Sequence, residues 1–276
     1  MRVLGLLKGR WRIFALTTNA DRADAIRSAG AVPLIGNLDQ PETLGRLAGL
    51  ADAVLHLAPP PATGTTDPRT ANLLHAIGRK GRVARIVYAS TTGVYGDCGG
   101  AVFDETRAVK PATDRARRRV DAEARLRWHG RATCACVTIL RIPGIYAVDR
   151  EGGHPRERLQ RGTAVLRAED DVYTNHVHAD DLARACVAAL VRGLPQRIVH
   201  ASDDTELRMG DYFDLAADLC GLPRPPRISR DEAAQRLPPT LMSFMSESRR
   251  LSNRRLKREL RLKLRYPTVR EGLAGT

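Results

Sequence analysis

The sequence predicts an α/β protein with a doubly wound parallel sheet and a smaller C-terminal α/β portion. Short apolar runs rich in β-forming residues alternate with helical segments through the first half of the chain, a pattern typical of a parallel sheet covered by helices on both faces. Ser90, Thr91 and Thr92 directly follow one of these runs, and ligands bind at this edge of such sheets. The length of 276 residues suits one large domain or a domain with a smaller appendage.

Strands and helices are expected to alternate from residue 11 onward. We expect strands at residues 11–17, 31–35, 53–57, 83–89 and 136–140, and helices at residues 21–29, 41–50, 69–77 and 112–128. Gly30 ends the first helix and Pro41 begins the second, which are usual positions for these residues. Pro59, Pro60 and Pro61 end the third strand because proline cannot continue a sheet. After residue 141 the alternation loosens.

Composition and charge limit the partners and the compartment. The formal net charge is +14, and arginine carries almost all of the positive charge. Because a basic face alone is a weak sign of nucleic-acid binding, we expect no nucleic-acid partner. No segment is long and apolar enough to span a bilayer, and the first residues do not resemble a secretory signal, so we expect no membrane association. The five cysteines, an odd number, favour the reducing cytoplasm over a disulfide framework, and no metal site is expected.

Four motifs occur in an order that resembles one known family. They are DAVLHLA at residues 52–58, STTGVYG at 90–96, LRIPGIY at 140–146 and NHVHADDL at 175–182. Together they resemble the NAD-dependent epimerase/dehydratase family, the extended short-chain dehydrogenase/reductases. The resemblance implies a Rossmann-like fold that binds NAD or NADP, and hydride transfer that is often part of the epimerisation or dehydration of a nucleotide-sugar. It also implies a small-molecule substrate and a homodimer.

The resemblance divides the chain into two parts. Residues 1–141 are expected to form a Rossmann-like dinucleotide-binding domain that is incomplete at its N-terminal side. Residues 142–276 are expected to form mainly a substrate-binding portion, with some segments that return to the sheet.

The family's catalytic residues carry over unevenly. The resemblance implies a tyrosine that moves a proton, a lysine four residues later that lowers the pKa of that tyrosine, and a Ser or Thr that holds the substrate oxygen. Thr91 takes the hydroxyl position, whereas Arg115 and Arg119 stand at the tyrosine and lysine positions and share one helix face. A guanidinium stays protonated and is a poor acid-base group, although Arg119 can still hydrogen-bond a ribose or a phosphate.

Proton transfer therefore needs a different group, or is absent. Tyr95 and His178 are the candidates for a non-standard proton carrier. Thr92 and Gly93 stand where the dehydratase branch carries an Asp-Glu pair, which disfavours dehydration. The sequence therefore predicts an atypical NAD(P)-dependent oxidoreductase that acts on a nucleotide-sugar or another polar carbonyl or hydroxyl compound. The alternative is a catalytically silent NAD(P)-fold protein that senses a ligand or binds a protein partner.

The phosphate-binding turn of the family is not found in this chain. A dinucleotide-binding fold opens with a strand, a Gly-x-Gly-x-x-Gly turn and a helix, and the sequence contains no such motif. Residues 11–17 resemble the family's second strand, and residues 2–9 resemble the end of a helix closed by Gly9. We therefore expect the first strand and the turn to be missing, with a first strand at residues 2–6 as the alternative.

The remaining cofactor contacts are expected at the ends of later strands. No carboxylate stands ready for the ribose 2′-hydroxyl after residues 11–17, and Arg22 can meet a 2′-phosphate, which favours NADP over NAD. The expected cofactor-binding residues are Thr17, Thr18, Asn19, Arg22, Asn37, Leu38, Leu57, Ala58, Pro59, Ser90 and Pro143.

Overall fold

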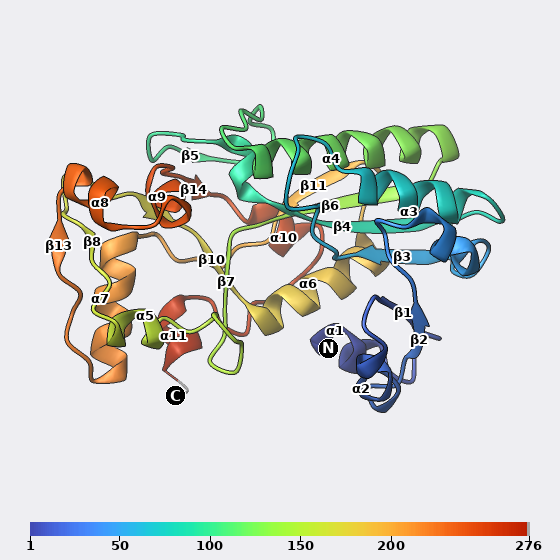
Figure 1. Cartoon of the computed structure of the whole chain (residues 1–276), viewed down its shortest axis with the longest axis horizontal. Helices are drawn as coiled ribbons and strands as arrows, with labels where there is room; N and C mark the ends of the chain where they lie inside the picture. The colour runs from blue at the N-terminus through green and yellow to red at the C-terminus, as the bar shows by residue number, and fades with distance from the viewer. Residues whose placement is uncertain (275–276) are drawn as a thin grey trace.

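A four-stranded parallel sheet of order β11-β6-β4-β3 forms the centre of the protein, as the computed structural model of residues 1–274 describes it (Figure 1). Every neighbouring pair in this sheet is parallel. Ile86, Val87 and Ile139 are almost completely buried, because strands between two helix layers contact apolar side chains on both faces. The strands are β3 (Ala53–His56), β4 (Arg85–Thr91), β6 (Cys136–Ile142) and β11 (Arg197–His200).

Helices cover both faces of the central sheet, which confirms the predicted doubly wound architecture. Helices α3 (Pro68–Gly78) and α4 (Asp114–Thr133) lie on one face, and α6 (Ala179–Arg192) lies on the other (Figure 1). Leu126 of α4 packs with Ile86 and Ile139 in one core, and Ala185 of α6 packs with Val87 in another.

The N-terminal segment contains a separate two-stranded sheet, although its apolar side chains pack into the main cores. Strands β1 (Phe14–Thr17) and β2 (Val32–Ile35) pair with each other in a separate parallel sheet. Between them lie η1 (Ala20–Arg22) and α2 (Ala23–Ser28), and η2 (Pro41–Leu47) follows. Within residues 1–274, neither β1 nor β3 has a second strand partner, so the two sheets do not join into one.

The segment before β1 is helical, as expected. Helix α1 (Arg2–Leu7) is followed by Gly9 in the left-handed region, with φ of 77°, and it packs against α6. The alternative of a first strand at residues 2–6 is therefore wrong. Leu7 lies in the core beneath α6, and burial of this side chain explains why the short helix is held in place.

Several expected elements differ in their bounds. Strand β4 continues through Thr91, so the hydroxyls of Ser90 and Thr91 belong to the strand and do not follow it. The expected helix at residues 41–50 is the 3₁₀ helix η2, and the one at residues 21–29 divides into η1 and α2. Helix α4 begins where Thr113 Oγ1 accepts a hydrogen bond from the Ala116 N–H at 3.2 Å, the usual role of threonine before a helix.

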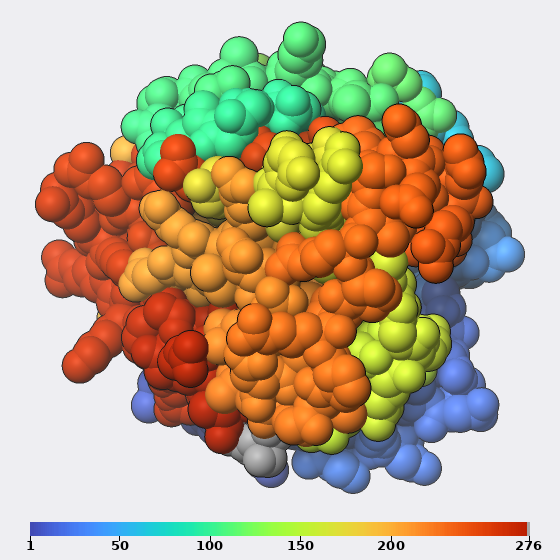
Figure 2. All heavy atoms as spheres, turned by 90° about the vertical axis from the view of Figure 1, so that its left-hand side faces the viewer, coloured from blue at the N-terminus to red at the C-terminus, as the bar shows by residue number. Residues whose placement is uncertain are grey.

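The C-terminal portion has a second apolar core and several short strand pairs. Met245 and Val165 are fully buried in this core. Figure 2 looks onto this end of the molecule, where α7 and the chain after it (orange) lie beneath the segment that follows β4 (green). The helices here are α5 (Arg156–Gln160), α7 (Met209–Cys220), α8 (Arg230–Arg236), α9 (Pro239–Met245), α10 (Arg254–Arg258) and α11 (Val269–Leu273), whereas η3 (Thr92–Tyr95) directly follows β4. The strands are β7 (Gly144–Tyr146), β8 (Val165–Leu166), β9 (Tyr173–Thr174), β10 (His176–His178), β12 (Leu207–Arg208), β13 (Arg227–Ile228) and β14 (Arg250–Leu251). Strand β5 (Val102–Phe103) precedes α4 in the chain and pairs with β14.

Strand β11 and helix α10 come from this half of the chain but pack at the central sheet. Across residues 1–274, no helix combines the length and the apolar character needed to cross a bilayer.

Candidate functional site

The C-terminal end of β4 holds two hydroxyls that differ in their availability. Ser90 is buried, and its Oγ donates to Glu123 Oε1 of α4 at 2.5 Å. Thr91 is half-buried, and its Oγ1 accepts from the Gly93 N–H at 3.3 Å, which caps η3. The Thr91 hydroxyl proton remains available to another acceptor. Of the two, Thr91 is therefore the hydroxyl that can meet a substrate.

A buried ion pair between Arg141 and Glu123 lies next to the end of β4. Arg141 of β6 donates from Nη2 to Glu123 Oε2 at 2.7 Å and from Nε to Glu123 Oε1 at 3.1 Å. The two side chains are only 3% and 6% exposed. The Arg141 guanidinium also lies 4.7 Å from the centroid of the Tyr95 ring. The pair fixes the ends of β4 and β6 relative to α4.

Tyr95 is placed inside the protein and not at the accessible strand end. It is 1% exposed, and its hydroxyl lies 2.6 Å from His200 Nε2. His200 Nδ1 lies 3.0 Å from the Ser252 carbonyl oxygen. Because a carbonyl can only accept, Nδ1 carries the proton, and Nε2 accepts from the Tyr95 hydroxyl. Burial raises the pKa of Tyr95 to about 12 and lowers that of His200 to about 3, so both groups stay neutral near pH 7.

His178, the other candidate proton carrier, has a structural place in the fold. It is buried, and its Nδ1 accepts from the Asp180 N–H at 3.2 Å at the start of α6. Its ring lies 3.8 Å, centroid to centroid, from that of Tyr266. The structure therefore brings neither Tyr95 nor His178 to Thr91 in an accessible position.

Arg119 and Arg115 lie on one face of α4 but have different partners. Arg119 Nη1 donates to the Ala89 carbonyl at 2.6 Å and to the Tyr88 hydroxyl at 3.0 Å. Arg115 is exposed, and its guanidinium lies 4.6 Å from the centroid of the Phe244 ring in α9. Arg119 thus sits beside the end of β4, whereas Arg115 reaches to the C-terminal portion.

Two further residues near this strand end were not among the candidate site residues, although His56 belongs to the DAVLHLA motif. Tyr88 is fully buried, and burial raises its pKa to about 12 although the adjacent Arg119 lowers it. His56, at the end of β3, lies 2.8 Å from Thr70 Oγ1 through Nε2, and Thr70 in turn donates to Asp67 Oδ2 at 2.7 Å. Thr70 must therefore accept from His56 Nε2. Burial lowers the pKa of His56 to about 4, so it is a neutral donor.

The expected cofactor-binding residues occupy the ends of β1, β2, β3, β4 and β6. At the β1 end, Asn19 Oδ1 accepts from the Asp21 N–H at 2.8 Å, and Thr17, on the strand, bonds the Asn19 backbone. Thr18 and Arg22 are exposed there. The Leu38 carbonyl, after β2, accepts from Asn72 at 2.7 Å. These contacts order the loops without closing off the exposed side chains.

A salt bridge joins the loop after β2 to helix α3. Arg69 donates to Asp39 from Nε at 2.7 Å and from Nη2 at 2.6 Å, and its Nη1 donates to the Pro59 carbonyl at 3.0 Å. The Arg69 guanidinium lowers the pKa of Asp39. Leu57, directly after β3, is 46% exposed, so a large apolar side chain is open to a ligand there.

The remaining residues that the sequence predicts to bind the cofactor also lie just after strand ends. Asn37 Oδ1 accepts from the Asp39 N–H at 2.9 Å, and Ala58 and Pro143 are half-buried. In the part of the chain from residue 1 to 274, no group of three or more His, Cys, Asp or Glu residues is arranged to hold a metal ion.

Comparisons with known proteins identify the family. Residues 6–201 match the NAD dependent epimerase/dehydratase family. No curated protein matches the sequence. A conserved protein of unknown function from Silicibacter pomeroyi has a similar structure, with a TM-score of 0.79, 30% identity and coverage of 99% of this chain and 93% of that chain.

Two enzymes of known activity share the fold at lower identity. UDP-glucose 4-epimerase from Thermotoga maritima, solved with UDP-glucose, has a TM-score of 0.80 and 17% identity over 99% of this chain and 92% of that chain. UDP-glucuronic acid 4-epimerase from Bacillus cereus, solved with NAD, has a TM-score of 0.76 and 15% identity over 99% and 92%. Because the family model matches residues 6–201, which is more than half of the sequence, the chain belongs to the NAD dependent epimerase/dehydratase family.

Proposed function

We propose that the protein is an atypical NAD(P)-dependent oxidoreductase that acts on a nucleotide-sugar or another polar carbonyl or hydroxyl compound. The observation that carries the proposal is the placement of the Arg119 guanidinium against the Ala89 carbonyl, one strand residue before Ser90 and two before the available Thr91 hydroxyl. A fixed positive charge and a hydroxyl donor at one strand end stabilise negative charge on a substrate oxygen.

The chemistry differs from that of a tyrosine–lysine pair. A nicotinamide cofactor supplies a hydride to a carbonyl carbon. Thr91 would donate to the carbonyl oxygen, and Arg119 would stabilise the alkoxide that forms there. Because a guanidinium keeps its proton, water supplies the proton that completes the alcohol. Thr92 and Gly93 offer no acid-base pair, so we do not expect dehydration.

The residues at the strand ends suit the two ends of a dinucleotide. Asn37 and Arg22 provide polar groups at the ends of β1 and β2, where the adenosine half would lie, and Arg22 supports the choice of NADP. Leu57 provides apolar contact, and Pro143 and Thr91 would adjoin the nicotinamide. The glycine-rich turn that usually donates hydrogen bonds to the pyrophosphate is not in this sequence. The expected protein contacts are therefore concentrated on the adenosine and nicotinamide ends of the cofactor.

Cofactor binding and turnover test the proposal together. NADPH and NADH would be titrated separately, with the fluorescence of the reduced nicotinamide as the readout, and turnover would be followed with a panel of nucleotide-sugars that begins with UDP-glucose. We expect binding with a preference for NADPH. Thr91→Val should lower turnover about 10²-fold, the usual effect of losing one donor to a developing oxyanion, and should leave NADPH affinity unchanged.

Thr106→Val is the matched control, because Thr106 is exposed and its hydroxyl donates only to Asp104. The failure of both cofactors to bind would contradict the proposal. Cofactor binding without turnover would favour the second candidate, a catalytically silent ligand sensor or protein-binding scaffold. The burial of Tyr95 favours that candidate, because it removes the tyrosine hydroxyl from proton transfer with a substrate.

We also propose that the protein is a homodimer that pairs through α3 and α4. A largely apolar groove lies between these helices, and Trp128 beside it is 66% exposed. Large exposed aromatic side chains are enriched in protein interfaces. Trp128→Glu should convert the dimer to a monomer in light scattering after gel filtration, whereas Trp11→Glu, which changes an exposed tryptophan of the segment before β1, should not. A wild-type monomer would refute the dimer.

The five described cysteines are all free. This state supports our proposal that the protein works in a reducing compartment such as the cytoplasm.

A further inference from the structure

The first two turns of α4 carry two guanidinium groups that have no ion-pair partner within residues 1–274. Arg115 and Arg119 are four residues apart, so they lie on one face of the helix with about 6 Å of rise between them. Arg115 is exposed and Arg119 is half-buried. The helix therefore presents two positive charges beside the end of β4.

The acidic residues of α4 do not neutralise these charges, because each already pairs with another arginine. The three ion pairs have distances of 2.6–2.7 Å and are Asp114–Arg117, Asp121–Arg125 and Glu123–Arg141. Arg115 and Arg119 are therefore left to meet a negative group that does not belong to this helix.

Arg119 is fixed at the end of β4 but keeps free hydrogen-bond donors. Its Nη1 donates to the Ala89 carbonyl at 2.6 Å and to the Tyr88 hydroxyl at 3.0 Å, whereas Nε and Nη2 have no hydrogen-bond partner in the described part of the chain. Burial, and to a smaller extent the Arg119 charge, lower the pKa of His56 to about 4. The Arg119 charge thus acts on neighbouring groups, and the available Thr91 hydroxyl is two strand residues beyond Ala89.

Arg115 is oriented by a contact that uses none of its hydrogen-bond donors. Its guanidinium carbon lies 4.6 Å from the centroid of the Phe244 ring in α9. Such a contact is a cation–π interaction, and the ring offers no oxygen or nitrogen acceptor. The N–H groups of Arg115 therefore stay free while the side chain is held between the end of β4 and the C-terminal portion, the part that the sequence predicts to bind the substrate.

We propose that Arg115 and Arg119 bind a carboxylate of the substrate, so that the protein acts on a sugar acid in preference to a neutral sugar. The inference rests on the proposed function, because it names the substrate class of the same site. The planar guanidinium offers parallel N–H donors that match the two oxygens of a carboxylate. Arg115 would hold the carboxylate, and Arg119 would lie between it and the substrate oxygen that Thr91 contacts.

The separation of the two arginines sets where the carboxylate lies in the substrate. Because one helix turn separates Arg115 from Arg119, which would adjoin the reacting carbon, the carboxylate should lie within a few bonds of that carbon. A uronic acid meets this condition, since its C6 carboxylate is close to C4 and C5. The phosphates of a nucleotide-sugar do not, because they are attached at C1, on the other side of the ring.

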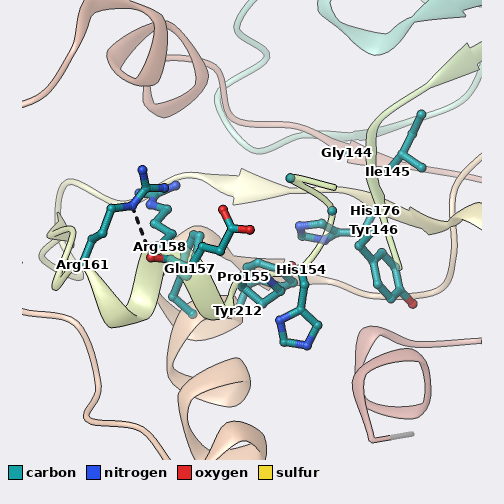
Figure 3. Close-up of a pocket in the computed structure, with 13 residues that line it drawn as sticks. Gly144, Ile145, Tyr146, His154, Pro155, Glu157, Arg158, Arg161, His176 and Tyr212 are labelled. Carbon is teal, nitrogen blue, oxygen red and sulfur yellow. Dashed lines mark hydrogen bonds between the residues drawn. The ribbon is translucent and has the colours of Figure 1, made fainter. Parts of the chain in front are cut away.

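The pocket in the C-terminal portion is a separate place. It has a volume of about 290 Å³ and lies between β7, α5, β10 and α7, and neither Arg115 nor Arg119 lines it (Figure 3). Substitutions of the two arginines therefore leave the walls of this pocket unchanged. A change of binding in such variants reflects the end of β4.

Equilibrium binding to the full chain tests the proposal without turnover. Two pairs of probes differ only in the acidic or neutral group at C6: UDP-glucuronate with UDP-glucose, and glucuronate with glucose. In isothermal titration calorimetry with NADPH present, at least one acid should bind about 10-fold more tightly than its neutral counterpart, the lower end of what hydrogen bonds to a charged group contribute. The pair that shows the difference tells whether the sugar acid is nucleotide-linked or free. Equal affinities within both pairs, or no binding of either acid, would refute the proposal.

Variants of α4 separate this site from the general positive charge of the protein. Arg115→Gln should fold as the wild type does, because the side chain is exposed, and it should remove the preference for the acid without changing the affinity for the neutral sugar. Arg131→Gln removes an exposed charge from the last turn of the same helix and should keep the full preference. A preference that persists in Arg115→Gln, or that Arg131→Gln lowers equally, would overturn the proposal.

Failure of this inference differs from failure of the proposed function. Equal binding of acidic and neutral sugars by a protein that binds NADPH and turns over UDP-glucose would refute the substrate class alone. A preference for the acid without NADPH binding would refute the oxidoreductase and leave the carboxylate site in place.

Discussion

Glu123→Gln should be among the most destabilising single substitutions in the protein. The carboxylate of Glu123 accepts two hydrogen bonds from Arg141 and one from Ser90, and both members of the ion pair are almost fully buried. The amide has the same shape but no charge. Arg141 would therefore remain buried beside the Tyr95 ring without a counter-ion. Breaking a buried pair in this way costs about 3–5 kcal/mol of unfolding free energy.

Urea denaturation of wild type and variant measures this loss directly. Asp218→Asn is the control, because its ion pair with Arg224 is exposed, with the two side chains 52% and 61% accessible. It should cost less than about 1 kcal/mol. The double variant Glu123→Leu/Arg141→Met removes both charges and should recover most of the lost stability. A loss of less than about 1 kcal/mol in Glu123→Gln would show that the pair does not hold the strand ends as argued.

Two further predictions concern buried histidines and a glycine elsewhere in the protein. Stability should fall as the pH is lowered from about 6.5 toward 4, because the pKa values of His56 and His200 are depressed to about 4 and about 3 in the folded state, so the unfolded chain takes up these protons first. The slope should reach about 1.4 kcal/mol per pH unit for each histidine, and a stability that does not change between pH 7 and 5 in urea titrations would contradict it. Gly96→Ala should destabilise by several kcal/mol, because Gly96 has φ of 64° and a Cβ there would lie 2.4 Å from the Lys110 carbonyl oxygen. Gly99→Ala, with φ of 57° and no atom within 4 Å of its Cβ, should lose only about 1 kcal/mol; equal losses would show that the contact with Lys110 is irrelevant.

The alternation of strands and helices was predictable because it depends on local sequence. Apolar β-forming runs and the glycine and proline positions indicate strands, helices and their ends without any knowledge of distant contacts. The residue at which β4 ends is harder to predict from the sequence. Ser90 and Thr91 are polar, and only the pairing of Ser90 with Arg141 and Thr91 with Ile142 in β6 extends the strand through them.

The partners of the polar side chains could not be predicted for a different reason. Tyr95 meets His200, which lies 105 residues later in the sequence, and Arg115 meets Phe244 in a helix of the C-terminal portion. No spacing rule connects such residues. Tyr95 therefore looked like a candidate for proton transfer, although the fold gives its hydroxyl a buried partner.

The separate pairing of β1 with β2 determines which part of the protein can unfold locally before the central sheet does. These strands share no hydrogen-bond ladder with the central sheet, so they can open without breaking the hydrogen bonds of β3, β4, β6 and β11. Regions of this kind form the low-energy openings of a native protein. Thr17 and Asn37, two of the residues that the sequence predicts to contact the cofactor, lie on β1 and shortly after β2. A cofactor that bridges from there to Thr91 would link the two sheets, and its binding affinity would then include the free energy of closing the small sheet onto the large one.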